Sequence, residues 1–154
     1  FKGRNRRPPK DAVNAMLSFV YTLISNDVTA ALETVGLDPY VGFMHALRPG
    51  RPSLALDIME ELRAYLGDRL VLSLINRKQI TGNQFLQQGD ESIIMTDDAR
   101  RTIISAWQAR KKEQIQHPFL NEKVSIGLLP HIQAMMLARY LRNDLDDYPV
   151  FLIQ

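Results

Sequence analysis

The residues of this chain best suited to chemistry lie in one stretch, 42–61. A histidine, His45, comes from a segment rich in proline and glycine, and three acids follow it at Asp57, Glu60 and Glu61. On an α-helix these acids stand at i, i+3 and i+4, so their carboxylates would share one face. Like charges at such spacings repel by about 0.2–0.5 kcal/mol per pair, so a cation nearby would stabilise the cluster.

Two kinds of cation fit this cluster. One is the set of surrounding arginines, Arg48, Arg51 and Arg63, together with plain solvent. The other is a divalent metal ion held by His45 and the helix carboxylates. Oxygen ligands with one imidazole suit Mg²⁺ or Mn²⁺ better than zinc. A metal beside arginines in an open loop also suits a phosphodiester substrate. The residues by themselves leave both alternatives open.

The helix that carries the acids is predicted to begin at Ser53, whose hydroxyl can cap the first turn. Leu54, Ile58 and Leu62 repeat every four residues along it and are predicted to face the core. Gly67 is predicted to end this helix.

Helical spacing of apolar residues recurs through most of the chain, so the predicted fold is all-α, a single multi-helix domain. Asp11 is expected to cap a helix that starts at Ala12. Two short apolar runs punctuated by glycine predict one short β-hairpin near residues 84–95, the only strand signal found. The acidic, aromatic tail 144–154 fits no helix pattern and is expected to pack on a neighbouring subunit.

A long helix is predicted after Thr96. Its buried side would include Ile103, Trp107 and Ile115, with its arginines and lysines facing outward. Trp107 at this spacing indicates a core residue, because base-stacking surfaces usually present several aromatic side chains together.

The basic residues are unevenly placed. Five of the nineteen lie within residues 1–10, which leaves fourteen basic against seventeen acidic residues in 11–154. The chain is therefore divided into a basic N-terminal arm, 1–10, and a helical domain, 11–154. Such an arm can neutralise phosphates, and it can equally be a solvated terminus.

Several classes of protein are disfavoured by what the sequence lacks. It has no cysteine, so disulfides and zinc–thiolate sites are excluded. The lack of cysteine also fits a cytoplasmic protein. No run approaches eighteen apolar residues, which predicts no membrane span. Phosphate-binding glycine loops and nucleophile elbows are missing, which argues against nucleotide hydrolysis and acyl transfer.

A family resemblance runs through nearly the whole chain. It rests on Gly-Leu-Asp-Pro-Tyr-Val-Gly-Phe-Met-His at 36–45, on Arg-Pro-Gly-Arg-Pro-Ser-Leu-Ala-Leu-Asp-Ile-Met-Glu-Glu at 48–61, and on segments 6–18, 117–119 and 148–151. Together these resemble the catalytic domain of the CRISPR adaptation integrase, the Cas1 family. The resemblance implies a metal-dependent DNA endonuclease and integrase that inserts spacer DNA into a CRISPR array. It also implies a homodimer that works with Cas2 on double-stranded DNA with 3′-hydroxyl ends.

The resemblance also implies a metal site. Its histidine maps onto His45 and its acidic ligand onto Glu60, while Asp57 matches a second acidic position near the metal. A further glutamate of the family lies upstream of the position matched by Phe1. We therefore expect a fragment without the N-terminal β domain, inactive by itself because one ligand is missing.

Basic residues of the loop, the helix and the arm complete the expected site. Those predicted to contact DNA are Arg48, Arg51, Arg63, Arg6, Arg7 and Lys10. Two alternatives remain open at this point: a helical DNA-binding or assembly module without chemistry, and a nonspecific nuclease that shares the site but not the integration reaction.

Overall fold

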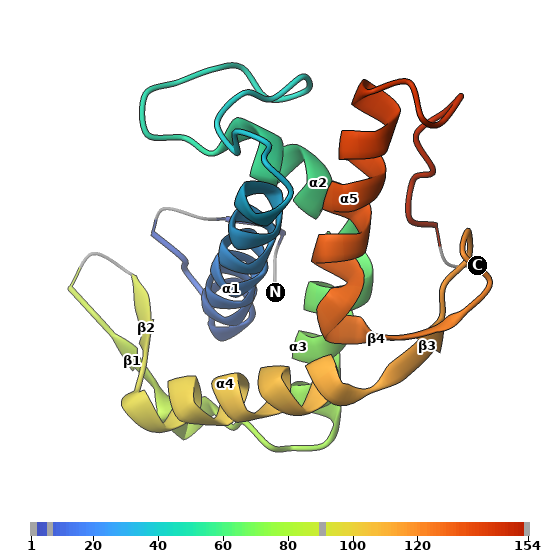
Figure 1. The fold of residues 1–154 in the computed structure, drawn as a ribbon. Coiled ribbons are helices and arrows are strands. Elements are labelled where there is room, and N and C mark those ends of the chain that lie inside the picture. Colours follow the sequence, from blue (N-terminus) through green and yellow to red (C-terminus); the bar gives the residue numbers. More distant parts are fainter. Residues whose placement is uncertain (1–2, 6–7, 90–91, 153–154) are drawn as a thin grey trace.

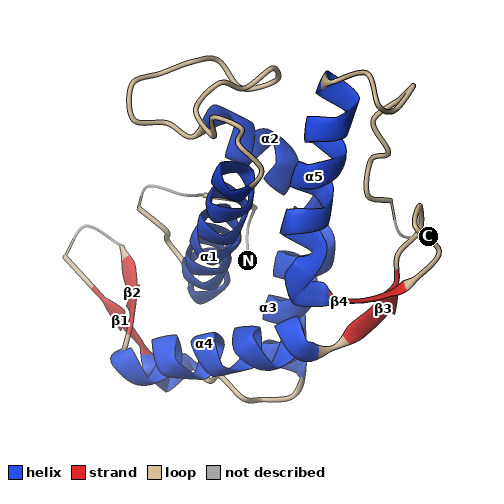
Figure 2. Ribbon diagram, in the orientation of Figure 1, coloured by secondary structure: helices blue, strands red, loops and turns tan. Residues whose placement is uncertain are grey.

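The longest helix, α1 (Ala12–Thr34), packs against most of the other helices. The computed structural model describes residues 3–5, 8–89 and 92–152. The other α-helices in these residues are α2 (Ser53–Arg63), α3 (Arg69–Asn76), α4 (Asp97–Lys112) and α5 (Leu129–Leu141). Helices α2, α3 and α5 contact α1, and α4 crosses one end of the bundle (Figures 1 and 2). The predicted multi-helix domain is confirmed, with more β-structure than expected.

Helix α1 begins where the sequence predicts. The Asp11 carboxylate accepts the backbone N–H of Asn14 at 2.8 Å and so satisfies one of the free amides of the first turn. The helix continues through the polar pair Asn26 and Asp27 without a break.

By length and composition alone α1 could cross a membrane, with a mean hydropathy of 1.3. In the fold it is a core helix instead. Val20, Ile24 and Val28 are fully buried against the neighbouring elements. Its apolar character is therefore accounted for by the core of this domain.

Helix α2 is started differently from the prediction. Its N-cap is Pro52, and the Ser53 hydroxyl makes no capping bond but donates to the Ala46 carbonyl at 3.2 Å. The backbone N–H groups of Leu54 and Ala55 donate to the Pro39 carbonyl, at 2.9 and 3.2 Å. The preceding loop thus folds back over the start of α2 and takes the role expected of Ser53.

The prediction that Gly67 ends the acidic helix was wrong. A π-helical turn, η1 (Ala64–Asp68), joins α2 directly to α3. A Cβ on Gly67 would lie 2.9 Å from the Tyr21 ring, so the glycine serves the close approach of α1. Along this continuous helical stretch the buried apolar residues include Leu54, Ile58, Leu62, Leu66, Leu70 and Leu74.

Both ends of α4 carry a β-hairpin. The expected one is confirmed as β1 (Phe85–Gln87) paired antiparallel with β2 (Ile93–Met95). The other was missed: α4 ends at Lys112, and Ile115, expected on the helix, lies in β3 (Gln114–Gln116), which pairs with β4 (Lys123–Ser125).

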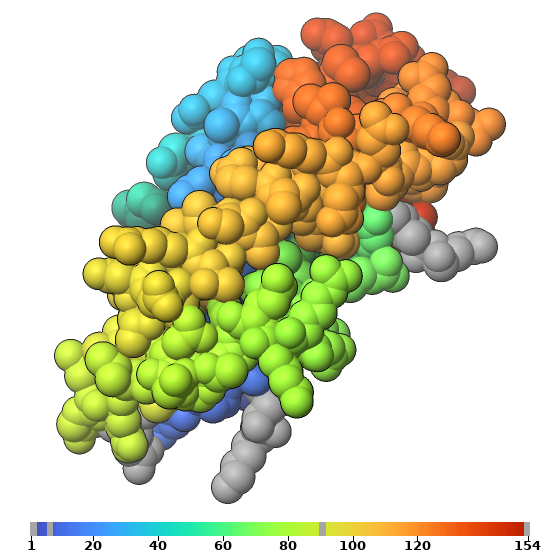
Figure 3. Space-filling model, turned by 90° about the horizontal axis from the view of Figure 1, so that it is seen from below, coloured from blue at the N-terminus to red at the C-terminus, as the bar shows by residue number. Residues whose placement is uncertain are grey.

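The predicted cap and core residue of α4 are confirmed. The Thr96 hydroxyl accepts the N–H of Ala99, and the Trp107 side chain is 2% exposed. Seen from below, α4 runs across the molecule beside the segment that follows α3 (Figure 3). Its basic residues do not all face outward as expected. Arg110 donates to the Tyr65 carbonyl and Lys111 pairs with Asp27.

The C-terminal tail packs on this chain's own core. Phe151 is 2% exposed, and its N–H donates to Glu61 at 2.6 Å. The Tyr148 hydroxyl and the Gln133 amide also donate to the Glu61 carboxylate. Burial raises the pKa of Glu61 more than these hydrogen bonds lower it. The tail was expected on a neighbouring subunit, and the structure instead uses its aromatic side chains within the domain.

We expect Tyr148→Phe to lower the free energy of unfolding by about 1–3 kcal/mol, because a buried carboxylate oxygen of Glu61 loses its donor. Urea unfolding followed by circular dichroism measures the change. Tyr140→Phe is the matched control on the exposed surface of α5, where an effect below about 0.5 kcal/mol is expected. Equal effects of the two substitutions would show that the bond to Glu61 does not hold the tail.

Candidate active site

A buried carboxylate organises the loop before α2. Asp57 is 3% exposed, and its oxygens accept the backbone N–H groups of Phe43, Met44 and His45 at 2.7, 3.0 and 2.9 Å. The loop can wrap this closely because residue 42 is glycine. A Cβ there would lie 2.7 Å from both Asp57 Oδ2 and the Ser53 Cβ.

The same carboxylate orients the imidazole of His45. Nδ1 of the ring lies 2.6 Å from Asp57 Oδ1. An ionised carboxylate only accepts, so Nδ1 carries the proton and the lone pair of the ring is on Nε2. A histidine backed by a carboxylate in this way is suited to bind a metal or accept a proton through Nε2.

Asp57 stays ionised over a wide pH range. Burial raises the pKa of its carboxyl, but the hydrogen bonds from Met44, from the His45 ring and from Phe43 outweigh burial and hold the pKa below its usual value. A lowered pKa in the fold means that the stabilisation is present above the unfolded value of about 3.9 and is lost as the pH falls through the folded value. The loop is therefore held throughout the neutral range.

His45 and Glu60 line one cavity of about 290 Å³. Arg51 from the loop and Arg4 from the N-terminal segment line it too, and α1 adds polar side chains. The Glu60 carboxylate accepts a hydrogen bond from Arg63 at 2.8 Å, with both side chains about one third exposed. The structure thus places Asp57 in contact with the histidine ring and Glu60 on the same cavity as the histidine, while Glu61 is not part of this group.

The three acids do not share one face as expected. Asp57 is turned to the loop backbone and Glu61 to the C-terminal tail, while Glu60 faces the cavity. The loop and the tail supply the donors that separate them. Within residues 3–5, 8–89 and 92–152, no group of three His, Cys, Asp or Glu side chains is placed to hold a metal ion.

The predicted DNA-binding residues are dispersed. Arg51 lines the cavity with His45, and Arg63 lines a second cavity of about 520 Å³ between α1 and α3. Arg48 is exposed in the loop, and Lys10 is exposed before α1. Two further arginines of the arm, Arg6 and Arg7, lie outside the described residues.

Sequence reasoning missed Arg4 and Tyr21, which line both cavities. Arg4 was one of several basic residues in the arm. The signal that could have distinguished it is Asn14, because a buried asparagine in the first turn of a helix can bind the chain before that helix.

Comparison with known proteins identifies the family. The family model described as CRISPR associated protein Cas1 matches residues 1–109, which is most of the chain. The chain belongs to the Cas1 family. The family resemblance stated from the sequence is therefore confirmed.

Among Cas1 relatives, a CRISPR-associated endonuclease Cas1 of Chlorobaculum tepidum is 60% identical over 98% of this chain and 44% of its own length. A Leptospira interrogans relative, described as a CRISPR-associated endonuclease Cas1, is 53% identical over 99% of this chain and 59% of its own length. This Cas1 chain thus spans about half the length of these curated relatives.

Solved structures show the same fold. A Cas1 protein from Thermotoga maritima has a TM-score of 0.83 at 30% identity, over 92% of this chain and 43% of that one. A chain of a Cas6-RT-Cas1–Cas2 complex has a TM-score of 0.84 at 28% identity, and the match covers 100% of this chain and 17% of that one. A casposase bound to an integration product shares the fold, with a TM-score of 0.86 at 23% identity. The match covers 98% of this chain and 43% of that one.

We expect Asp57→Asn to release the loop. The amides of Phe43, Met44 and His45 should exchange their hydrogens about tenfold to a hundredfold faster, because hydrogen bonds to a charged acceptor contribute about 1.5–3 kcal/mol each. Hydrogen exchange followed by mass spectrometry or NMR measures this. Glu60→Gln is the matched control on the same helix. Unchanged protection in Asp57→Asn would mean that the carboxylate does not hold the loop.

Proposed function

We propose that this chain carries part of the catalytic centre of a metal-dependent DNA endonuclease and integrase. The observation that carries the proposal is that His45 and Glu60 line one cavity, with the imidazole backed by Asp57. Membership of the Cas1 family and the relatives' description as endonucleases support this class of protein. The reaction that we propose is the cleavage or transesterification of a DNA phosphodiester by which spacer DNA enters a CRISPR array.

The donor set fits a hard divalent cation in kind. Nε2 of His45 and the Glu60 carboxylate would hold Mg²⁺ or Mn²⁺, with further ligands from water, from DNA and from a residue outside those described. Two protein ligands are a partial set. When bound, such a cation polarises the scissile phosphate and favours deprotonation of the attacking hydroxyl.

The other residues of the cavity have separate roles. Asp57 keeps the proton of His45 on Nδ1 and so fixes the direction of Nε2. Arg63 holds the Glu60 carboxylate in place. Arg51 faces the same cavity and can bind two oxygens of a phosphate with its planar guanidinium. The exposed Arg48 and Lys10 are also proposed to contact the DNA backbone, as are Arg6 and Arg7, which lie outside the described residues.

Substrates and partners are proposed for the whole protein rather than for this chain. The relatives' description as endonucleases supports DNA as substrate, and we propose double-stranded DNA with 3′-hydroxyl ends. The likeness to a chain of a Cas1–Cas2 complex supports Cas2 as a partner. We extend this to a homodimer that acts in the cytoplasm.

In the intact protein, His45→Ala is expected to lower DNA cleavage and strand joining by more than about a hundredfold. The reason is that even second-shell partners of metal ligands contribute about 10–100-fold. Product formation on a labelled oligonucleotide duplex with Mn²⁺ measures it, and circular dichroism checks the fold. His131→Ala on α5 is the matched control. Full activity of His45→Ala would remove this residue from the reaction and favour a DNA-binding module without chemistry.

Metal binding is tested separately from activity. Mn²⁺ at a hundred times its Kd should stabilise the intact protein by about 2.7 kcal/mol. His45→Ala and Glu60→Gln should each reduce the shift in Tm, whereas Arg142→Gln, a charge change at the far end of α5, should not. A shift that both site substitutions leave intact would place the metal elsewhere.

A further inference from the structure

The segment before α1 is fastened to that helix by one buried side chain. Asn14 has no exposed surface. Its amide nitrogen donates to the Gly3 carbonyl at 2.9 Å and to Asp11 at 2.7 Å. Its amide oxygen accepts the N–H of Asn5 at 3.1 Å and the guanidinium of Arg4 at 2.8 Å. One side chain thus binds three successive residues of the segment.

The guanidinium of Arg4 is held in a defined place by these and other contacts. It donates to the Asn5 carbonyl at 2.6 Å and to the Ser18 hydroxyl at 3.1 Å. It also lies over the ring of Tyr21, 5.3 Å from the centroid. The oxygens of Asn14, Asn5 and Ser18 that accept these bonds fix the position of the guanidinium.

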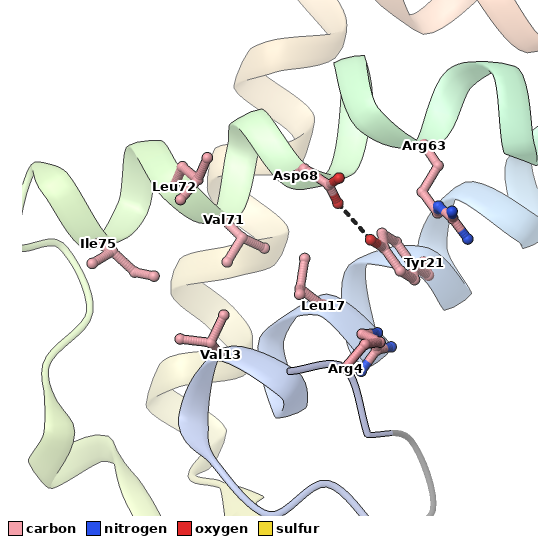
Figure 4. Close-up of a pocket in the computed structure, with 9 residues that line it drawn as sticks. All are labelled: Arg4, Val13, Leu17, Tyr21, Arg63, Asp68, Val71, Leu72 and Ile75. Carbon is pink, nitrogen blue, oxygen red and sulfur yellow. Dashed lines mark hydrogen bonds between the residues drawn. The ribbon is translucent and has the colours of Figure 1, made fainter. Parts of the chain in front are cut away.

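Arg4 stands where the two cavities meet. It lines the cavity of His45 and Glu60 and also the larger one between α1 and α3. Arg63 lies 5.5 Å from the same Tyr21 ring, and Figure 4 shows the two arginines at one end of the larger cavity with Tyr21 between them. Arg63 is paired with Glu60 at 2.8 Å, so its charge is already partly balanced.

Arg51 reaches the smaller cavity from the opposite segment of chain, the loop before α2. Two guanidiniums from the two segments therefore face one polar cavity that also holds His45 and Glu60. A cavity of this composition favours an anion with several oxygens, and a phosphate group matches the fork of a guanidinium.

We infer that Arg4 contacts a phosphate of the DNA strand bound at the cavity of His45 and Glu60, and that Asn14 is its positioning residue. The identity of the strand rests on the function proposed above. Asn14 holds the segment, and with it Arg4, before DNA binds. The Arg4 side chain therefore loses little conformational entropy on binding. The sequence-based list of DNA-binding residues did not include Arg4.

The experiment measures DNA binding by the intact protein over a series of salt concentrations, using fluorescence anisotropy of a labelled oligonucleotide duplex. Losing one phosphate contact should make the slope of log K against log salt shallower by about 0.9 for duplex, or about 0.7 for a single strand. Arg4→Gln should show this change with about three- to tenfold weaker binding. Arg142→Gln removes the same charge elsewhere and should keep the wild-type slope. A wild-type slope in Arg4→Gln would overturn the inference.

The positioning role of Asn14 has its own readout. Asn14→Ala should weaken binding about as much as Arg4→Gln, and the double variant should be no weaker than Arg4→Gln alone. Additive losses would show that Asn14 acts on the fold and not through Arg4. Arg4→Lys, which keeps the charge but not the fork, should recover part of the slope. If Asn14→Ala does not fold, Asn14→Ser takes its place in the same cycle.

His45→Ala separates this inference from the proposed function. Measured without divalent metal, it should bind DNA with the wild-type salt slope; with Mn²⁺ it should fail to join strands. If it joins strands normally while Arg4→Gln loses its phosphate contact, the proposed function fails and the contact of Arg4 stands. If Arg4→Gln binds as the wild type does while His45→Ala is inactive, the inference about Arg4 fails and the proposed function stands.

Discussion

The site depends on the carboxylate of Asp57, buried at the start of α2. It draws in three consecutive backbone amides and one imidazole nitrogen, and so turns an irregular loop into a fixed support for His45. A buried charge without partners would be costly, and here every partner comes from the loop it orders. The same interactions therefore fold the loop and fix the position of the histidine.

Helix α2 is held from two sides by acids one turn apart. Asp57 binds the loop that precedes the helix, and Glu61 binds the C-terminal tail, 90 residues away in the case of Phe151. Between them Glu60 is left facing the cavity, where Arg63 steadies it. From the sequence these acids were expected to form a cluster of repelling charges. In the structure each carboxylate accepts hydrogen bonds from its own donors, and this avoids their mutual repulsion.

Local signals predicted the local features well. Asp11 and Thr96 cap their helices as expected, and the first hairpin lies where glycines punctuate short apolar runs. One failure is local, the missed hairpin of β3 and β4. Two others involve partners distant in sequence. The Pro39 carbonyl, rather than the Ser53 side chain, accepts the first N–H groups of α2. Gly67 is required by the close approach of the Tyr21 ring and does not end the helix. The histidine and its acidic neighbours were proposed as a site from spacing and family resemblance. Their separate orientations were not, since no local pattern encodes the docking of the loop and the tail.

The π-helical turn changes the direction in which the apolar residues of this helical stretch point around its axis. From Leu54 to Leu74 the apolar residues recur strictly every fourth position, and all six are buried. In an ordinary α-helix each such step overshoots one turn by about 40°, so the row would wind around the helix and its far end would face water. One wider turn at Ala64–Asp68 takes up part of that drift. The stretch from α2 through α3 therefore stays in contact with α1 along its length.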